Sequence, residues 1–163
     1  MNKLLVLGIG NMLLTDDGVG VFASQELMKE DWPEQVTIRE GVTFTQDIFY
    51  SFKGYSHLLV LDVVHCGGKP GTLYRLTEDA LIKDDKQRLS IHDIDLIDSL
   101  RMAEKLFGTK SELLVLGVEP KDYVTWNIGL SDDVQAVFPE FLALARKEIG
   151  EWLKRYGNGE TRA

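Results

Sequence analysis

Uninterrupted apolar runs mark three places along the chain and predict buried strands. The runs are Leu4–Leu7, Leu58–Leu61 and Leu113–Leu116. Apolar residues without polar alternation are typical of central parallel strands that are covered on both faces. The alternating segment Val36–Arg39 predicts another strand, and Thr72–Leu76 predicts a further strand at a sheet edge. This edge strand is predicted to be antiparallel to the strand before it, because only a short connection separates the two.

Apolar residues at helical spacing predict helices between the strands. The first helix is expected at about Gly18–Glu30, and the last begins at Ser131 as its N-cap. Pro139 predicts a kink or a later start in that last helix. The remaining expectations are a helix capped by Ser90 or Asp93 and ending near Phe107, a short helix with Ile48, Phe49 and Phe52 capped by Thr43 or Thr45, and a solvated helix or loop over Glu78–Arg88.

The alternation of strands and helices predicts the fold class. We expect an α/β three-layer sandwich: a mostly parallel, five-stranded twisted sheet with one antiparallel edge strand and helices on both faces. The chain has 163 residues, which suits one domain, and we place it at residues 1–156. Residues 157–163 are expected to form a flexible C-terminal tail.

Composition excludes several classes of protein. The formal net charge of -8 argues against nucleic acids and anionic membrane surfaces as partners. Cys66 is the only cysteine, so no internal disulfide can form, which fits a cytoplasmic protein. No apolar run approaches the roughly 20 residues that a membrane span needs. Asp16 and Asp17 stand where a signal peptide would need small residues at its cleavage site, so we do not expect a signal peptide. The small, acidic chain suggests a monomer.

A glycine turn and two acids follow the first predicted strand. Gly8 and Gly10 match the first two glycines of a dinucleotide-binding motif, but Leu13 stands where that motif has its third glycine. The Gly-Lys-Ser/Thr sequence of a P-loop does not follow either. The acid pair would also repel a pyrophosphate. One of Asp16 and Asp17 is expected to cap the next helix, and the other to act at the carboxyl edge of the sheet, where α/β proteins place their ligands.

Two further residues are candidates for the same site. Asp62 interrupts an apolar strand, and a buried carboxylate without a partner costs several kcal/mol. It either accepts backbone N–H bonds at the strand end or serves as a ligand or acid/base on the same edge as Asp17. His92 is predicted in a loop just before a helix, and it is either structural or a third member of the site. Two carboxylates and an imidazole suit a divalent ion such as nickel or zinc. His65 and Cys66 are metal ligands by type, but adjacent side chains on an extended chain diverge, so we interpret them as loop residues.

Segments in a fixed order resemble one known family. The stretch Gly8–Gly20 resembles the opening signature of the [NiFe]-hydrogenase maturation proteases. Further matches follow along nearly the whole chain: Glu40–Thr43, Leu61–Val63, Pro70–Leu73, Ser90–His92, Gly117–Pro120 and Gly129–Ser131. The chain departs from the family pattern at Asp17, where relatives often have glutamate. It also departs at Glu40 and Val42, which replace the aspartate and the second glycine of an Asp-Gly-Gly-Thr-like turn.

The resemblance implies an endopeptidase that removes a C-terminal extension from the nickel-loaded precursor of a [NiFe]-hydrogenase large subunit. It also implies that Asp17, Asp62 and His92 are the metal-binding and catalytic residues. Nickel is expected to be carried by the substrate, and other divalent metals to fit the same ligands.

The residues leave the catalytic class open between an aspartic-type and a metal-assisted protease. The chain lacks the Gly-x-Ser-x-Gly and His-Glu-x-x-His patterns of other hydrolases. Asp17, Asp62 or the metal would activate water, with Asp16 as a substitute. Two alternatives are a general metallohydrolase with its own zinc and a non-enzymatic metal or cofactor chaperone.

Overall fold

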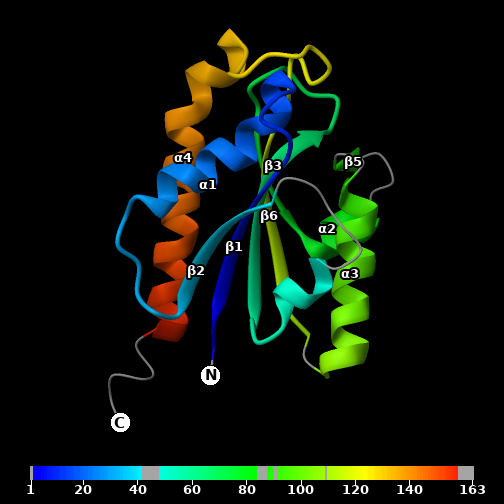
Figure 1. The fold of residues 1–163 in the computed structure, drawn as a ribbon, viewed down its shortest axis with the longest axis vertical. Coiled ribbons are helices and arrows are strands. Elements are labelled where there is room, and N and C mark those ends of the chain that lie inside the picture. The colour runs from blue at the N-terminus through cyan, green and yellow to red at the C-terminus, as the bar shows by residue number, and fades with distance from the viewer. Residues whose placement is uncertain (1, 42–47, 84–87, 90–91, 109, 158–163) are drawn as a thin grey trace.

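A mixed six-stranded sheet forms the middle layer of the protein in its computed structural model (Figure 1). Five strands lie side by side in the order β2 (Val36–Gly41), β1 (Leu4–Ile9), β3 (His57–His65), β6 (Glu112–Val118) and β4 (Leu73–Thr77). The first four are parallel, and β4 is antiparallel to β6. The predicted mostly parallel sheet with one antiparallel edge strand is confirmed. The two-residue strand β5 (Arg88–Leu89), which was not predicted, pairs with the end of β3.

The structure describes residues 2–41, 48–83, 88–89, 92–108 and 110–157. Within these ranges, the side chains of residues 48–49, 82–83, 88–89 and 92–95 lie outside the described part. The predicted helix caps Thr43, Thr45 and Ser90 therefore fall outside the described residues.

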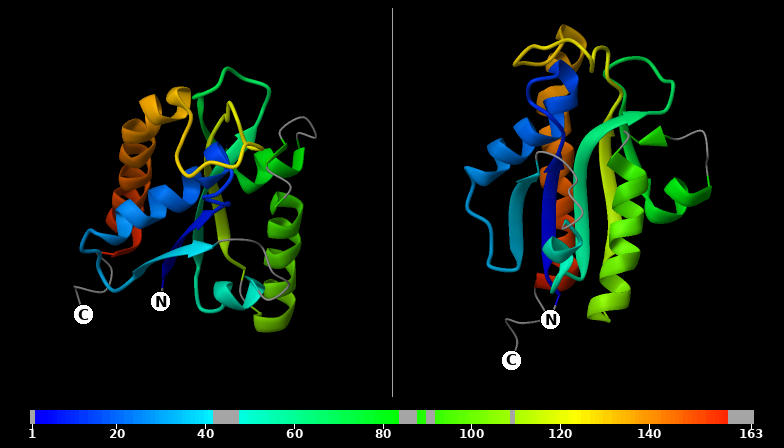
Figure 2. Two further views of the ribbon diagram at one scale, coloured as in Figure 1. Left: turned by 45° about the horizontal axis from the view of Figure 1, so that its top comes forward. Right: turned by 45° about the vertical axis from the view of Figure 1, so that its right-hand side comes forward.

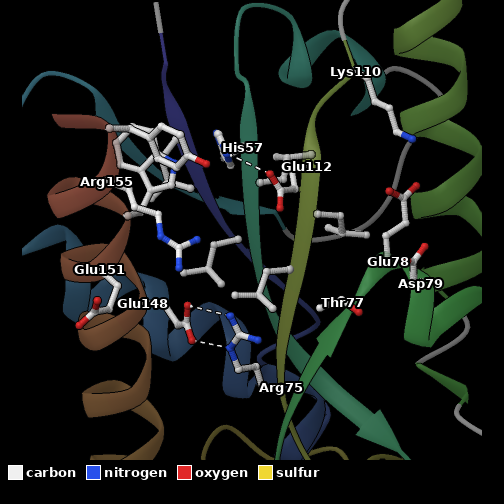
Figure 3. Close-up of a pocket in the computed structure, with 17 residues that line it drawn as sticks. His57, Arg75, Thr77, Glu78, Asp79, Lys110, Glu112, Glu148, Glu151 and Arg155 are labelled. Carbon is white, nitrogen blue, oxygen red and sulfur yellow. Dashed lines mark hydrogen bonds and ion pairs between the residues drawn. The ribbon is translucent and has the colours of Figure 1, made fainter. Parts of the chain in front are cut away.

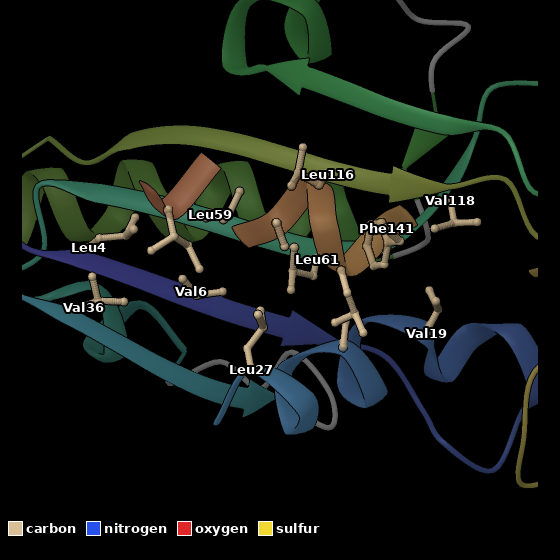
Figure 4. Close-up of a cluster of buried hydrophobic side chains, with 14 of the residues drawn as sticks. Leu4, Val6, Val19, Leu27, Val36, Leu59, Leu61, Leu116, Val118 and Phe141 are labelled. Carbon is tan, nitrogen blue, oxygen red and sulfur yellow. The ribbon is translucent and has the colours of Figure 1, made fainter. Parts of the chain in front are cut away.

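Helices cover both faces of the sheet (Figure 2). On one face lie α1 (Val19–Met28) and α4 (Asp132–Trp152), and on the other lie α2 (Glu78–Lys83), α3 (His92–Phe107) and the short 3-10 helix η2 (Ile48–Phe52). Each face has its own apolar core, and Figure 4 shows the core under α1 and α4. The three-layer sandwich is thus confirmed.

The strand β1 shows why the apolar runs are uninterrupted. Leu4 and Val6 belong to the core under α1 and α4, whereas Leu5, Leu7 and Ile9 belong to the core under α3. Successive side chains of a strand point to opposite faces, so a strand that is covered on both faces needs apolar residues at every position.

The close approach of α1 to the sheet depends on Gly20. A Cβ at this position would lie 2.0 Å from the carbonyl oxygen of Leu61 and 2.6 Å from that of Ile9. Only glycine therefore lets the first turn of α1 lie directly on β1 and β3. This contact places the segment just before α1 over the carboxyl ends of the two strands.

The predicted edge strand has a different neighbour from the one expected. It is antiparallel in direction to β3, as predicted, but β4 pairs with β6 and not with β3. The connection passes over the end of β6, where Gly71 N–H donates to the Glu119 carbonyl and Glu119 N–H donates to the Thr72 carbonyl. These hydrogen bonds carry the chain one strand further before it turns back.

The last helix also differs in detail from the prediction. Helix α4 begins at Asp132 and continues through Pro139, so a later start is wrong. Ser131 occupies the N-cap position, but its side chain makes no capping hydrogen bond. A π-helical turn, η3 (Leu153–Gly157), follows α4. Residues 158–163 lie outside the described part, and the predicted division into a domain and a tail stays a prediction.

Candidate active site

The loops after β1, β3 and β6 meet at the carboxyl edge of the sheet, at the top of Figure 1. The chain leaves β1 through Gly10, whose φ of 137° is a conformation that other residues rarely adopt. A Cβ at Gly10 would lie 1.8 Å from the carbonyl oxygen of Asp17. The glycine predicted to shape this turn is therefore required twice, by its backbone angle and by the packing of the turn against Asp17.

Thr15 stands at the sharpest point of this loop. Its φ is 52°, a left-handed conformation that is unusual for a β-branched residue and costs of order 1–3 kcal/mol. Two contacts hold it there: its N–H donates to the Asn127 carbonyl at 3.0 Å, and its Oγ1 donates to the Thr125 carbonyl at 2.7 Å. The loop after β6 thus fixes the backbone just before Asp16 and Asp17.

Asp16 is fully buried and anchors the loop after β6. Its Oδ2 accepts from the N–H groups of Lys121 and Asp122 at 2.9 and 3.0 Å, and from Ser131 Oγ at 2.8 Å. Its Oδ1 accepts from the N–H of Ser131 at 2.8 Å. Both oxygens are therefore engaged by the protein, so Asp16 is a structural residue. Its predicted role as a substitute ligand or base has no support in this geometry.

Asp17 lies beside Asp16 in the 3-10 helix η1 (Thr15–Gly18) and is 9% exposed. Its Oδ2 accepts a hydrogen bond from the N–H of Asn11 at 2.9 Å. Gly18 occupies the N-cap position of α1, and no side chain forms a capping hydrogen bond there. The expectation that one of the two aspartates caps α1 is therefore wrong: each carboxylate instead binds backbone N–H groups of a loop.

Asp62 is fully buried within β3, and its Oδ1 accepts from the N–H of Val63 at 2.8 Å. It does not end its strand as predicted, because β3 continues to His65. The strand is extended by pairing of Val64 and His65 with β5. Gly8 pairs with Leu61, however, so Asp62 lies at the level where β1 ends and the turn toward Asp17 begins.

His92 was predicted in the loop before a helix. In the structure it is instead the first residue of α3. Leu89 pairs with Val64 of β3. Three residues of chain span at most about 11 Å, so the His92 backbone stays within that distance of Leu89, near the end of β3. Its side chain lies outside the described part. Among the side chains that the structure describes, no group of three histidines, cysteines or acids is arranged to hold a metal ion.

Glu119 is a buried acid at the carboxyl edge of the sheet whose role was not predicted. Its Oε1 accepts from the N–H groups of Cys66 and Gly68 at 3.0 and 2.8 Å, and from Tyr74 Oη at 2.9 Å. Burial and the bond to Glu119 raise the pKa of Tyr74 to about 12. Glu119 follows an apolar strand directly, as a polar residue at the carboxyl edge. The same signal pointed to Asp62 and could have identified Glu119.

The other candidates make local contacts. The ring of His65 meets the ring of Tyr123 at a centroid distance of 4.7 Å. Cys66 forms no disulfide, and its N–H binds Glu119. The Glu40 carboxylate accepts from Gln25 Nε2 at 2.8 Å on α1.

A groove of about 750 Å³ lies at the opposite end of the sheet (Figure 3). It is lined by the first residues of β1, β3 and β6, among them Leu4, His57 and Glu112, and by the end of α4. Arg75 pairs with Glu148 at 2.6 Å across it, and His57 pairs with Glu112 at 3.2 Å. Burial lowers the pKa of His57, and the charge of Glu112 partly opposes this effect. None of the predicted site residues lines this groove.

Comparison with known proteins supplies the family. A family model described as "Hydrogenase maturation protease" matches residues 21–148, most of the chain. This chain belongs to the hydrogenase maturation protease family. It is therefore an endopeptidase, as the resemblance implied. None of the helices in the described ranges is long and apolar enough to cross a membrane.

Individual members of the maturation protease family match over most of this chain and over about three quarters or more of their own length. The HupD protein of Bradyrhizobium diazoefficiens is 29% identical over 153 residues, covering 93% of this chain and 80% of that protein. The hydrogenase 2 maturation protease of Escherichia coli is 29% identical, covering 83% of each chain. HupM of Azotobacter chroococcum is 31% identical, covering 91% of this chain and 72% of its own.

Solved structures of maturation proteases share the fold. The endopeptidase HybD from E. coli superposes with a TM-score of 0.79 at 28% identity, covering 91% of this chain and 93% of that chain. HybD from Thermococcus kodakarensis superposes with a TM-score of 0.75 at 22% identity, covering 90% of this chain and 99% of that chain. The overall fold is thus that of the family.

Proposed function

We propose that this maturation protease removes the C-terminal extension of the nickel-loaded precursor of a [NiFe]-hydrogenase large subunit. Water adds across one peptide bond, and the products are the mature subunit, with a new carboxylate, and a short peptide with a new amino group. Membership of the hydrogenase maturation protease family and similarity to the E. coli hydrogenase 2 maturation protease support this substrate class. The acidic chain with a single cysteine fits a monomeric cytoplasmic enzyme.

The carboxylate of Asp62 is the observation that carries the site assignment. It is fully buried in an apolar strand, at the level where β1 gives way to the turn that holds Asp17. A carboxylate is retained in such a position at a high desolvation cost, so a role in function is favoured over packing. The chain length between Leu89 and His92 keeps the third residue near the same edge.

We assign Asp17, Asp62 and His92 to binding the nickel that the substrate carries. Carboxylate oxygens and an imidazole nitrogen are ligands that nickel accepts, and zinc and other divalent ions fit the same set. Holding the substrate by its metal would position the scissile peptide bond for attack. Asp17 or Asp62 would accept the proton of the attacking water, unless the metal itself lowers the pKa of that water.

The mass of a large-subunit precursor, measured after incubation with the protease, tests this function. Loss of a C-terminal peptide from the nickel-loaded form alone is the expected result. Cleavage of both the loaded and the nickel-free form would favour a metallohydrolase with its own metal. Binding without any change of mass would favour a chaperone.

The substitution Asp62→Asn tests the site. We expect kcat/KM for the precursor to fall about 100-fold or more, because the charge that binds the metal or takes up the proton is lost. Asp98→Asn is the matched control, since Asp98 is exposed on α3. Full processing by Asp62→Asn, with an unchanged circular dichroism spectrum, would overturn the assignment.

A further inference from the structure

The most exposed large apolar side chains in the described part of the chain gather in the loop after β6. Val124, Trp126 and Ile128 are 69%, 73% and 72% exposed. Leu13, in the loop after β1, is 45% exposed. We call these four residues the apolar ridge. Isolated apolar residues on a surface are ordinary, but a tryptophan, an isoleucine and a valine within five residues are typical of a protein-binding surface.

The two loops of the apolar ridge are joined by backbone pairing. Leu14 and Asn127 form a parallel bridge, in which Asn127 N–H donates to the Leu13 carbonyl at 2.9 Å and Thr15 N–H donates to the Asn127 carbonyl at 3.0 Å. This register sets Leu13 beside Trp126. Alternation along paired segments then directs these two side chains to the same side of the bridge. The ridge therefore spans both loops as one surface.

Hydrogen bonds to Asp16 and within the loop itself hold the backbone of the ridge loop. Asp16 binds the loop at Lys121, Asp122 and Ser131. Asp122 Oδ1 accepts from the N–H groups of Val124 and Thr125 at 3.0 and 2.9 Å. The backbone is thus fixed before any partner arrives. A loop that is already ordered loses little conformational entropy on association, so its apolar surface binds more tightly than that of a mobile loop.

The position of the ridge identifies its partner. Leu13 precedes the predicted ligand Asp17 by only four positions, and Asp16, next to that ligand, anchors the ridge loop. We therefore expect a protein that presents a peptide bond to Asp17 to lie against the ridge. The net charge of -8, with Asp122, Asp132 and Asp133 in and just after this loop, argues against an anionic membrane as the occupant.

We infer that the apolar ridge docks onto an apolar surface of the folded hydrogenase large-subunit precursor, next to the point where its C-terminal extension leaves the folded part. This role rests on the proposed function. The ridge residues have no part in the chemistry, so they contribute to the affinity for the precursor and not to the rate of the chemical step. The metal ligands would bind the nickel, and the ridge would bind the protein that carries it.

Steady-state kinetics of precursor cleavage by the double variant Trp126→Ser, Ile128→Ser test this inference. We expect KM to rise at least tenfold while kcat stays within twofold of the wild type. The control is Met102→Ser, Leu106→Ser, which removes two exposed apolar side chains from α3, 48% and 57% exposed, away from the site. A KM for the ridge variant equal to that of the control would overturn the inference while leaving the proposed function intact.

Binding separates a failure of the inference from a failure of the proposed function. If the wild type cleaves no precursor, the proposed function fails, and calorimetric titration of the precursor still tests the ridge. Binding at least tenfold weaker for the ridge variant than for the control would support the docking surface. Equal affinities would overturn it. A wild-type dimer that the ridge substitutions dissociate, with KM unchanged, would assign the surface to a second copy and also overturn the inference.

Discussion

The two ends of the sheet hold their charged groups in different ways. At the carboxyl end, Asp16 and Glu119 are buried and accept hydrogen bonds from backbone N–H groups and hydroxyls. Among the described residues, neither of these two acids forms an ion pair. At the amino end, charged groups lie on the rim of an open groove, where Arg75 forms an ion pair with Glu148 and the His57 ring contacts the Glu112 carboxylate.

This difference shows why the groove at the amino end of the sheet is a poor guide to the functional site of this protein. In the groove, the charge of Arg75 is paired with that of Glu148. Carboxylates that bind N–H dipoles are not paired with a basic side chain, so the carboxyl end of the sheet can attract a cation. The same hydrogen bonds fix the loops on which the predicted ligand Asp17 and the apolar ridge stand.

Removal of the Asp16 carboxylate should have the largest effect on stability. In Asp16→Ala, the N–H groups of Lys121, Asp122 and Ser131 lose their acceptor. An unsatisfied, partly buried N–H costs about 1–3 kcal/mol, so we expect the free energy of unfolding to fall by about 2–4 kcal/mol. Urea denaturation measures this change. Hydrogen exchange should also become faster at Asn127 and Thr15, which depend on the loop.

Asp79→Asn serves as the control for this variant. Asp79 is an exposed residue that lines the groove at the other end. We expect the control to change stability by no more than about 0.5 kcal/mol. Equal changes in the two variants would show that the two ends of the sheet do not differ in the way described.

The Tyr74–Glu119 bond should give a pH effect of intermediate size. The pKa of Tyr74 is raised to about 12 in the folded protein, from 10.0, which is also the expected value in the unfolded chain. The unfolded tyrosine therefore loses its proton first. The stabilisation by this bond is complete below about pH 10 and is lost as the pH rises toward 12.

Glu119→Gln removes the charge that helps to raise this pKa but keeps an acceptor oxygen. We expect the Tyr74 pKa to fall only part of the way toward its ordinary value, because burial, its largest cause, and the remaining hydrogen bond still oppose ionisation. Absorbance of the tyrosinate in a pH titration measures the change, and Tyr74→Phe identifies the signal of this tyrosine among the others. The same Tyr74 pKa in Glu119→Gln and in the wild type would contradict the assigned cause.

The Arg75–Glu148 pair should contribute least. The Arg75 side chain is 53% exposed, and exposed ion pairs contribute about 0–1 kcal/mol. We expect Glu148→Gln to lower the free energy of unfolding by less than about 1 kcal/mol and to leave precursor cleavage unchanged. Thermal denaturation at low and high salt measures the effect. A loss as large as that of Asp16→Ala would remove the contrast between the two ends.

The strands were the most predictable part of this protein. Leu4–Leu7 and the two runs like it are apolar at every position because the strands are buried on both faces, and that requirement is written into each residue. The neighbours of a strand were less predictable. The edge strand β4 pairs with β6 because the chain after β3 crosses over Glu119. The local sequence pattern does not predict which strand such a connection leads to.

The site was predicted in part, and its two aspartates show the limit. Adjacent acids after a glycine turn have similar sequence signals, yet Asp16 binds the loop of residues 121–131 and Asp17 binds Asn11. The partners of Asp16 lie more than one hundred positions along the chain. A role that depends on such distant partners is set by the tertiary structure, so the sequence could nominate both acids but could not assign them.

The sequence by itself determined the strands, the class of fold, the family and the acids at the carboxyl edge of the sheet, because burial and turn geometry constrain residues locally. Only the tertiary structure decided that Asp16 and Glu119 serve as anchors for two loops and that Trp126 and Ile128 stand exposed in a loop that pairs with the segment just before Asp17. Hydrogen bonds and exposure depend on what the folded chain brings together, and that arrangement exists only once all the strands are in place.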